Sequence, residues 1–129
     1  MRVLVSGGAG YIGSTLVPML LEQGHQVRVF DSLLYGGQSL LGCWSHPQFE
    51  FVRGDLREPH AVESTVQGMD AVVHLAAIVG DPACAKQPDV AREVNYRGSM
   101  TLLEKATQAN VQRFIFSSTC SNYGRMADP

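Results

Sequence analysis

The chain has 129 residues, of which 45% are hydrophobic and 17% charged, and its formal net charge is −2. These values are ordinary for a single soluble domain that buries a core. The scattered basic residues argue against nucleic acid as a partner, and no run of about 18 apolar residues indicates a membrane span. The apolar run at the N-terminus is too short for a signal peptide, so we expect a cytoplasmic protein with no membrane partner.

Short β-branched apolar runs alternate with helix-period stretches, which is typical of a parallel sheet covered by helices on both faces. We expect five strands, at residues 2–6, 26–30, 49–53, 71–75 and 113–117. A helix over residues 11–23 follows the first strand. Its predicted buried stripe consists of Ile12, Leu16, Met19 and Leu20.

The longest helix-period stretch covers residues 89–108. Small or apolar residues recur in it at four-residue steps, which predicts one buried face with Asn95 near its edge. These residues are Val90, Val94, Gly98, Leu102 and Ala106. Residues 32–47 lack a clear period, so we expect a loop with one short helical turn.

Three glycines form the pattern Gly-x-x-Gly-x-x-Gly between the first strand and the first helix: Gly7, Gly10 and Gly13. Glycine is needed where the chain turns with positive φ, where a diphosphate approaches the backbone and where helix and strand pack closely. The helix N-terminus, with Tyr11 and Ile12, offers N–H donors to the diphosphate. The alternative is a glycine-rich turn that binds no ligand.

Asp31 ends the second strand, about 20 residues after the glycines, where an acid accepts hydrogen bonds from a ribose diol. Its charge would repel a 2′-phosphate, so the sequence favours NAD over NADP. The alternative is a strand-end turn acid that precedes Ser32.

At this point the sequence resembles the extended short-chain dehydrogenase/reductases, in particular the nucleotide-sugar epimerases and dehydratases. The resemblance covers essentially the whole chain, because the glycine fingerprint and four further motifs of this family occur in order. The further motifs are Gly54-Asp55-Leu56-Arg57, His74-Leu75-Ala76-Ala77, Asn95-Tyr96-Arg97-Gly98 and the segment from Ser117 to Gly124 that ends in Tyr123-Gly124.

The resemblance implies an α/β fold with a Rossmann-type doubly wound parallel sheet, five strands in the order 3-2-1-4-5. It also implies NAD as cofactor and a nucleotide-sugar substrate. Asp55 and Leu56 would then lie at the adenine, although Asp55 is equally well explained as a helix N-cap before Glu58. Asn95 would hold the central helix and a water near the active site, or else be an ordinary polar residue on a helix.

Three small or apolar residues after the fourth strand would let the diphosphate and the nicotinamide ribose approach closely. These residues are Leu75, Ala76 and Ala77, which without the resemblance would be read as core. The catalytic hydroxyl of the family falls on Thr119.

Three further side chains invite a chemical interpretation. His74 lies in a buried strand, so we interpret it as a structural histidine rather than an acid or base. Asp81 and Cys84, in the connection after the fourth strand, are candidates to line the nicotinamide and substrate, although a solvated loop is the favoured reading. Cys43, Cys84 and Cys120 form no metal-ligand pattern and are expected to be reduced.

The proton-transferring pair of the family, Tyr-x-x-x-Lys, does not occur in the chain, because none of its four tyrosines is followed by lysine at the fourth residue. Residues 1–129 are therefore expected to form the N-terminal part of an NAD-binding domain, without the catalytic pair and the substrate domain. We expect NAD binding as part of a nucleotide-sugar epimerase or dehydratase, and no turnover by these residues alone. A non-catalytic dinucleotide-binding module, a related dehydrogenase or reductase, and a homodimer stay open.

Overall fold

The computed structural model describes residues 1–80 and 86–119. Its sheet has five parallel strands in the order β3-β2-β1-β4-β5, as predicted. The strands are β1 (Arg2–Ser6), β2 (Gln26–Asp31), β3 (Phe49–Arg53), β4 (Ala71–His74) and β5 (Arg113–Phe116). The chain moves outward from β1 to β3 and then crosses to β4 on the other side of β1. This switch places the loops after β1 and β4 next to each other, at the edge where such sheets bind ligands.

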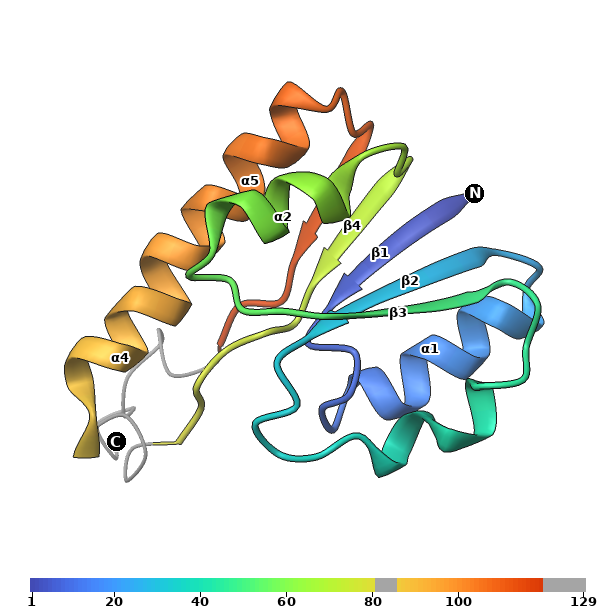
Figure 1. Ribbon diagram of the computed structural model, residues 1–129, viewed down its shortest axis with the longest axis horizontal. Helices are drawn as coiled ribbons and strands as arrows, with labels where there is room; N and C mark the ends of the chain where they lie inside the picture. Colours follow the sequence, from blue (N-terminus) through green and yellow to red (C-terminus); the bar gives the residue numbers. More distant parts are fainter. Residues whose placement is uncertain (81–85, 120–129) are drawn as a thin grey trace, which may run out of the picture.

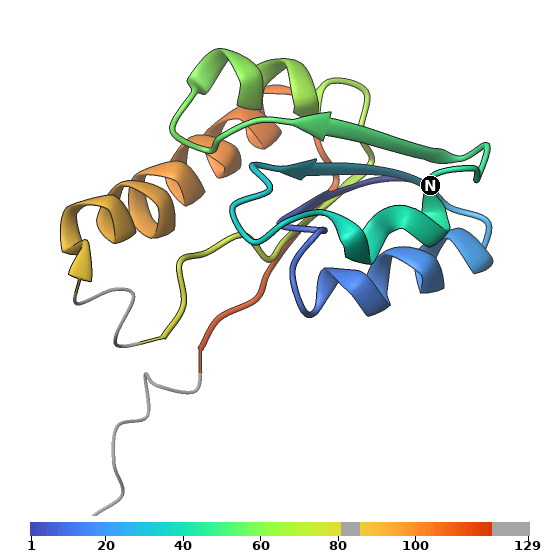
Figure 2. The same ribbon diagram turned by 60° about the horizontal axis from the view of Figure 1, so that its bottom comes forward.

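Helices cover both faces of the sheet (Figures 1 and 2). One face carries the helix α1 (Gly13–Glu22) and the 3-10 helix η1 (Gln38–Cys43), which is the short turn expected within residues 32–47. The other face carries α2 and one long helix. They comprise α2 (Pro59–Val66), α4 (Pro88–Arg92), the π-helical turn η2 (Glu93–Gly98) and α5 (Ser99–Gln108).

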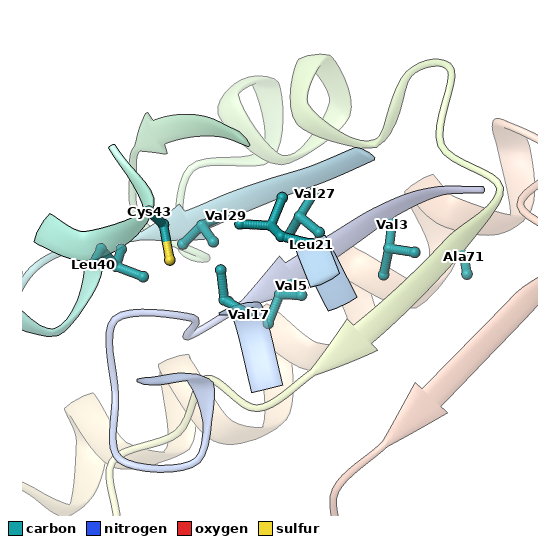
Figure 3. Packing of buried hydrophobic residues seen from close by; sticks show 9 residues of the cluster. All are labelled: Val3, Val5, Val17, Leu21, Val27, Val29, Leu40, Cys43 and Ala71. Carbon is teal, nitrogen blue, oxygen red and sulfur yellow. The ribbon is translucent and has the colours of Figure 1, made fainter. Parts of the chain in front are cut away.

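Alternation along the central strands divides the core into two layers, because successive residues of a strand point to opposite faces. In β1, Val3 and Val5 join the cluster under α1, which Figure 3 shows, whereas Leu4 joins the cluster under α2 and α5. The cluster under α1 consists of Val3, Val5, Val17, Leu21, Val27, Val29, Leu40, Cys43 and Ala71. The other consists of Leu4, Phe30, Leu56, Val62, Val66, Met69, Val72, Leu102 and Ala106.

The predicted buried stripe of α1 is wrong. Two of its members, Ile12 and Met19, are 55% and 56% exposed, and the other two, Leu16 and Leu20, are only half-buried. The buried residues of this helix are Gly13, Val17 and Leu21. Gly13 lacks a side chain and lies directly against the backbone of Gly8. The side of the helix that faces the sheet is therefore the side that carries Gly13.

Two features of the other face were not predicted. The helix α2 is only eight residues long, and its buried residues Val62, Thr65 and Val66 give too short a period to stand out in the sequence. The long helix contains the π-helical turn η2, although Gly98, Leu102 and Ala106 are buried as the four-residue spacing predicts. Within residues 1–80 and 86–119, no helix is long and apolar enough to span a membrane.

Candidate functional site

The glycine-rich loop between β1 and α1 depends on close approach between backbones. Gly7 has a φ of +76°, and a Cβ on it would lie 2.5 Å from the backbone nitrogen of Ala76. A Cβ on Gly13 would overlap the backbone of Gly8. Any other residue would therefore clash at both positions and would also be strained at Gly7. The tight turn and the close packing predicted for these two glycines are present.

Gly10 stands at a more open point of the loop. A Cβ there would meet only the carbonyl oxygen of Gly7, at 3.2 Å. The next two backbone N–H groups, of Tyr11 and Ile12, have no acceptor within the part of the chain that the structure describes. No side chain caps the helix that begins at Gly13. Unpaired N–H groups at the positive end of a helix suit an anion such as a diphosphate.

Asp31, the last residue of β2, reaches back to this loop. One carboxylate oxygen accepts the Ala9 N–H at 3.0 Å, and the other accepts the Leu33 N–H at 2.8 Å. Asp31 therefore serves as a turn acid, as the alternative reading predicted. It also keeps acceptor capacity, because a carboxylate offers about four lone-pair sites and the residues that the structure describes use two of them. A ribose diol could therefore use the remaining sites.

Asp55 and Leu56 follow β3, and the structure gives each a clear partner. The Asp55 carboxylate accepts from the Arg57 backbone N–H at 2.9 Å and from its guanidinium at 2.6 Å. These hydrogen bonds hold the pKa of Asp55 below its usual value. The N-cap interpretation of Asp55 is wrong, because α2 begins at Pro59 and its N-cap is Glu58. Leu56 is buried against Gly98. Contacts of both residues with adenine stay predictions.

The segment after β4 lies beside the glycine loop and is held from the long helix. Leu75 continues the pairing with β1 by donating its N–H to the Ser6 carbonyl at 2.9 Å. The Asn95 side chain accepts the Ile78 N–H at 2.7 Å and donates to the Ile78 carbonyl at 2.8 Å. Ala77, between them, is exposed. Asn95 therefore fixes the backbone of the segment that contains the three predicted ligand-approach residues.

His74 is buried in the sheet with only 1% of its surface exposed. Its Nδ1 lies 2.5 Å from the Ser6 hydroxyl and its Nε2 lies 2.7 Å from the Ser99 hydroxyl. Burial lowers the pKa of His74 to about 4. Burial and hydrogen bonds on both nitrogens are what a structural histidine requires, as the sequence predicts.

The remaining predicted site residues lie at the end of β5 or outside the described part. Thr119 is exposed three residues beyond Phe116, at the same edge of the sheet as the glycine loop. The Ser117 N–H donates to the His74 carbonyl at 3.1 Å, so β5 leads toward the β4 end. Asp81, Cys84 and Tyr123 lie outside the described residues.

Sequence reasoning missed Ser6, Ser99 and Ile78 as members of this site. The signal for Ser99 was available, because a residue four positions after Asn95 in a helix lies on the same side of it. Ser6 could have been suspected from its place immediately before Gly7. Ile78 takes part through its backbone N–H and carbonyl, and no residue pattern predicts backbone contacts of this kind.

The geometry at this edge defines a class of protein. A parallel sheet carries a glycine loop after β1, an acid at the end of β2 and small residues after β4, all at the topological switch point. This arrangement is that of a Rossmann-type dinucleotide-binding domain. The family model of the NAD dependent epimerase/dehydratase family matches residues 3–129. The chain therefore belongs to the NAD dependent epimerase/dehydratase family.

The chain is similar to enzymes of two activities. It is 41% identical to UDP-glucose 4-epimerase from Halalkalibacterium halodurans, over 96% of this chain and 36% of that protein. It is 40% identical to a 3 beta-hydroxysteroid dehydrogenase/Delta 5-->4-isomerase from Mycobacterium tuberculosis, over 93% of this chain and 32% of that protein. The chain thus spans about a third of these relatives.

A solved structure shows the same fold. The dTDP-glucose 4,6-dehydratase from Streptomyces venezuelae, crystallised with NAD, aligns with a TM-score of 0.92 and 36% identity. The alignment covers 100% of this chain and 42% of the dehydratase.

Proposed function

We propose that the chain binds NAD, with the loop 7–13 at the diphosphate and Asp31 at the adenosine ribose, as part of a nucleotide-sugar epimerase or dehydratase. The observation that carries the proposal is the meeting of the β1 loop, the end of β2 and the start of the β4 loop at one edge. NAD-bound neighbours with the same fold support the choice of cofactor.

NAD would supply a hydride acceptor and donor, and the protein would supply binding and orientation. The N–H groups of Tyr11 and Ile12 would hold the diphosphate. The Asp31 carboxylate would accept from the ribose diol and disfavour a 2′-phosphate. Thr119 would contribute a hydroxyl to the substrate. The proton-transferring group and the further substrate contacts would come from outside these 129 residues.

A second candidate is a hydroxysteroid dehydrogenase, which the 40% identity to the mycobacterial enzyme favours. Both activities require the same cofactor edge, so conversion of one substrate class or the other distinguishes them.

Assembly and location complete the proposal. The long helix exposes Tyr96, Met100 and Leu103, which lie three to four residues apart on one side of it. Such a stripe fits a self-complementary contact with a second copy, so we propose a homodimer. Cys43 forms no disulfide within residues 1–80 and 86–119, which fits a reducing cytoplasmic location.

The test is calorimetric titration of the full-length protein with NAD and with NADP, followed by incubation with UDP-, GDP- and dTDP-sugars and with 3β-hydroxysteroids. We expect NAD to bind more tightly than NADP and a nucleotide sugar to be converted. Equal or tighter binding of NADP would refute the role of Asp31. Conversion of the steroids alone would replace the first candidate with the second.

A further inference from the structure

A continuous chain of hydrogen bonds connects β1 to the loop after β4 through side chains far apart in the sequence. It runs from the Ser6 hydroxyl to the His74 ring, from the ring to the Ser99 hydroxyl, and from that hydroxyl to the Asn95 carbonyl at 2.7 Å. The Asn95 side chain then binds both backbone groups of Ile78. The proposed NAD-binding role assigns nothing to His74.

We propose that His74 is a positioning residue, which acts through Ser99 to set the orientation of Asn95 and hence the position of the backbone at Ile78. The inference rests on the proposed function where it concerns NAD, because the segment 75–78 borders the candidate dinucleotide site. The hydrogen bonds themselves do not depend on that function.

The direction of each hydrogen bond follows from counting protons. A serine hydroxyl carries one proton, and that of Ser99 is donated to the Asn95 carbonyl. The contact of 2.7 Å between the His74 Nε2 and Ser99 therefore requires a proton on Nε2. The neutral ring then has a lone pair on Nδ1, which accepts the proton of Ser6. The structure thus requires the Nε2–H tautomer of His74.

The hydrogen bond from Ser99 to the Asn95 carbonyl affects Asn95 because it lies at the turn of the helix that carries Asn95. Asn95 lies in the π-helical turn η2, and Ser99 is the first residue of α5. A hydroxyl that bonds the carbonyl four residues earlier often bends a helix locally. The His74 N–H holds the Ser99 oxygen in place for this bond. Without it, Ser99 can rotate and release the Asn95 carbonyl.

Two amide substitutions distinguish the role of the His74 Nε2 from that of its Nδ1. In His74→Gln the terminal amide reaches the former position of Nε2 and can donate to Ser99, but loses Ser6. In His74→Asn the shorter amide can accept from Ser6, but does not reach Ser99. Both variants remove the imidazole from the same buried site, so their losses of folding stability should be similar.

Ser99→Ala provides a third variant that keeps the ring. Ser64→Ala is its matched control, because the Ser64 hydroxyl also bonds a helix carbonyl but is exposed.

The measurement is amide hydrogen exchange of the Ile78 N–H in the full-length protein, with the buried Leu4 N–H reporting global unfolding. One lost hydrogen bond is worth about 1 kcal/mol, so His74→Asn and Ser99→Ala should accelerate Ile78 exchange relative to Leu4 about fivefold to tenfold. His74→Gln and Ser64→Ala should change it less than about twofold. The NAD affinity should fall in the same two variants and not in the other two.

The outcomes separate this inference from the proposed function. Equal acceleration in the Gln and Asn variants, or no acceleration in the Asn variant and Ser99→Ala, would overturn the role of His74. A proton on Nδ1 in the nitrogen-15 spectrum of the wild-type ring would overturn it too. If the wild-type protein binds no NAD, the proposed function fails, and Ile78 exchange still decides the positioning role.

Discussion

The loops after β1 and β4 lie side by side and achieve a fixed backbone in opposite ways. The loop after β1 is held by missing side chains, since Gly7 and Gly13 let backbones approach where any Cβ would clash. The segment after β4 is held by added side chains, His74 and Asn95, through hydrogen bonds. Steric fit depends only on the absence of a Cβ, whereas the hydrogen-bonded segment depends on proton positions. The two loops should therefore fail under different perturbations.

The strongest way to break the first loop is Gly7→Ala. The new Cβ would lie 2.5 Å from the Ala76 nitrogen and would stand on a residue with φ of +76°. We expect a loss of about 3 kcal/mol in the free energy of unfolding, from positive-φ strain of about 1 kcal/mol and from overpacking. Urea denaturation of both proteins measures it.

Gly24→Ala is the matched control for that change. Gly24 has a φ of +78°, and a Cβ there meets nothing within 4 Å. The control should lose only about 1 kcal/mol from backbone strain. Equal losses in the two variants would show that the approach of Gly7 to Ala76 does not matter for stability.

The same contrast explains what the sequence could predict. The strand bounds and the glycine turn followed from residue types that are adjacent in the chain, and the strand order followed from the family resemblance. The rotation of α1 was missed because it depends on Gly13 meeting the Gly8 backbone, which hydrophobicity does not encode. The path from His74 to Asn95 was missed because it joins a strand to a π-helical turn, and no local pattern predicts such a turn.

The second region should be more sensitive to acid than the first. The pKa of His74 is about 4 in the folded protein and 6.5 when exposed, so between these values the unfolded chain binds a proton that the folded chain does not. Stability should therefore be unaffected by this group above about pH 6.5 and fall by about 3 kcal/mol as the pH approaches 4.

The measurement for His74 is urea denaturation at pH 7 and pH 4.5 of the wild-type protein and of His74→Gln. Carboxyl groups titrate in both proteins, so the difference between the two pH dependences isolates the histidine. A pH dependence that is the same in both would contradict the low pKa.

Gly10→Val tests the first loop without breaking its fold. A Cβ at this position meets only the Gly7 carbonyl, at 3.2 Å, so folding stability should fall by about 1 kcal/mol. The branched side chain would stand where the backbone is proposed to meet the diphosphate. The NAD affinity should therefore fall at least about tenfold, which corresponds to a loss of about 1.4 kcal/mol in binding free energy. Gly42→Val, where a Cβ meets nothing within 4 Å, is the control for calorimetric titration. A folded Gly10 variant with unchanged affinity would limit this glycine to a structural role.

The smallest expected effect concerns a buried hydroxyl group that takes part neither in close backbone packing nor in the hydrogen bonds described above. Thr65 in α2 is 2% exposed, and its Oγ1 has no hydrogen-bond partner among the described residues. A buried hydroxyl without a partner costs about 1 kcal/mol or more, so Thr65→Val, which keeps the side-chain shape, should raise the free energy of unfolding by about 1 kcal/mol. Thr107→Val in α5 is the control, because that exposed hydroxyl donates to the Leu103 carbonyl and its removal should change little. Urea denaturation of both variants decides the matter. A destabilised Thr65→Val protein would mean that the hydroxyl has a partner in solution.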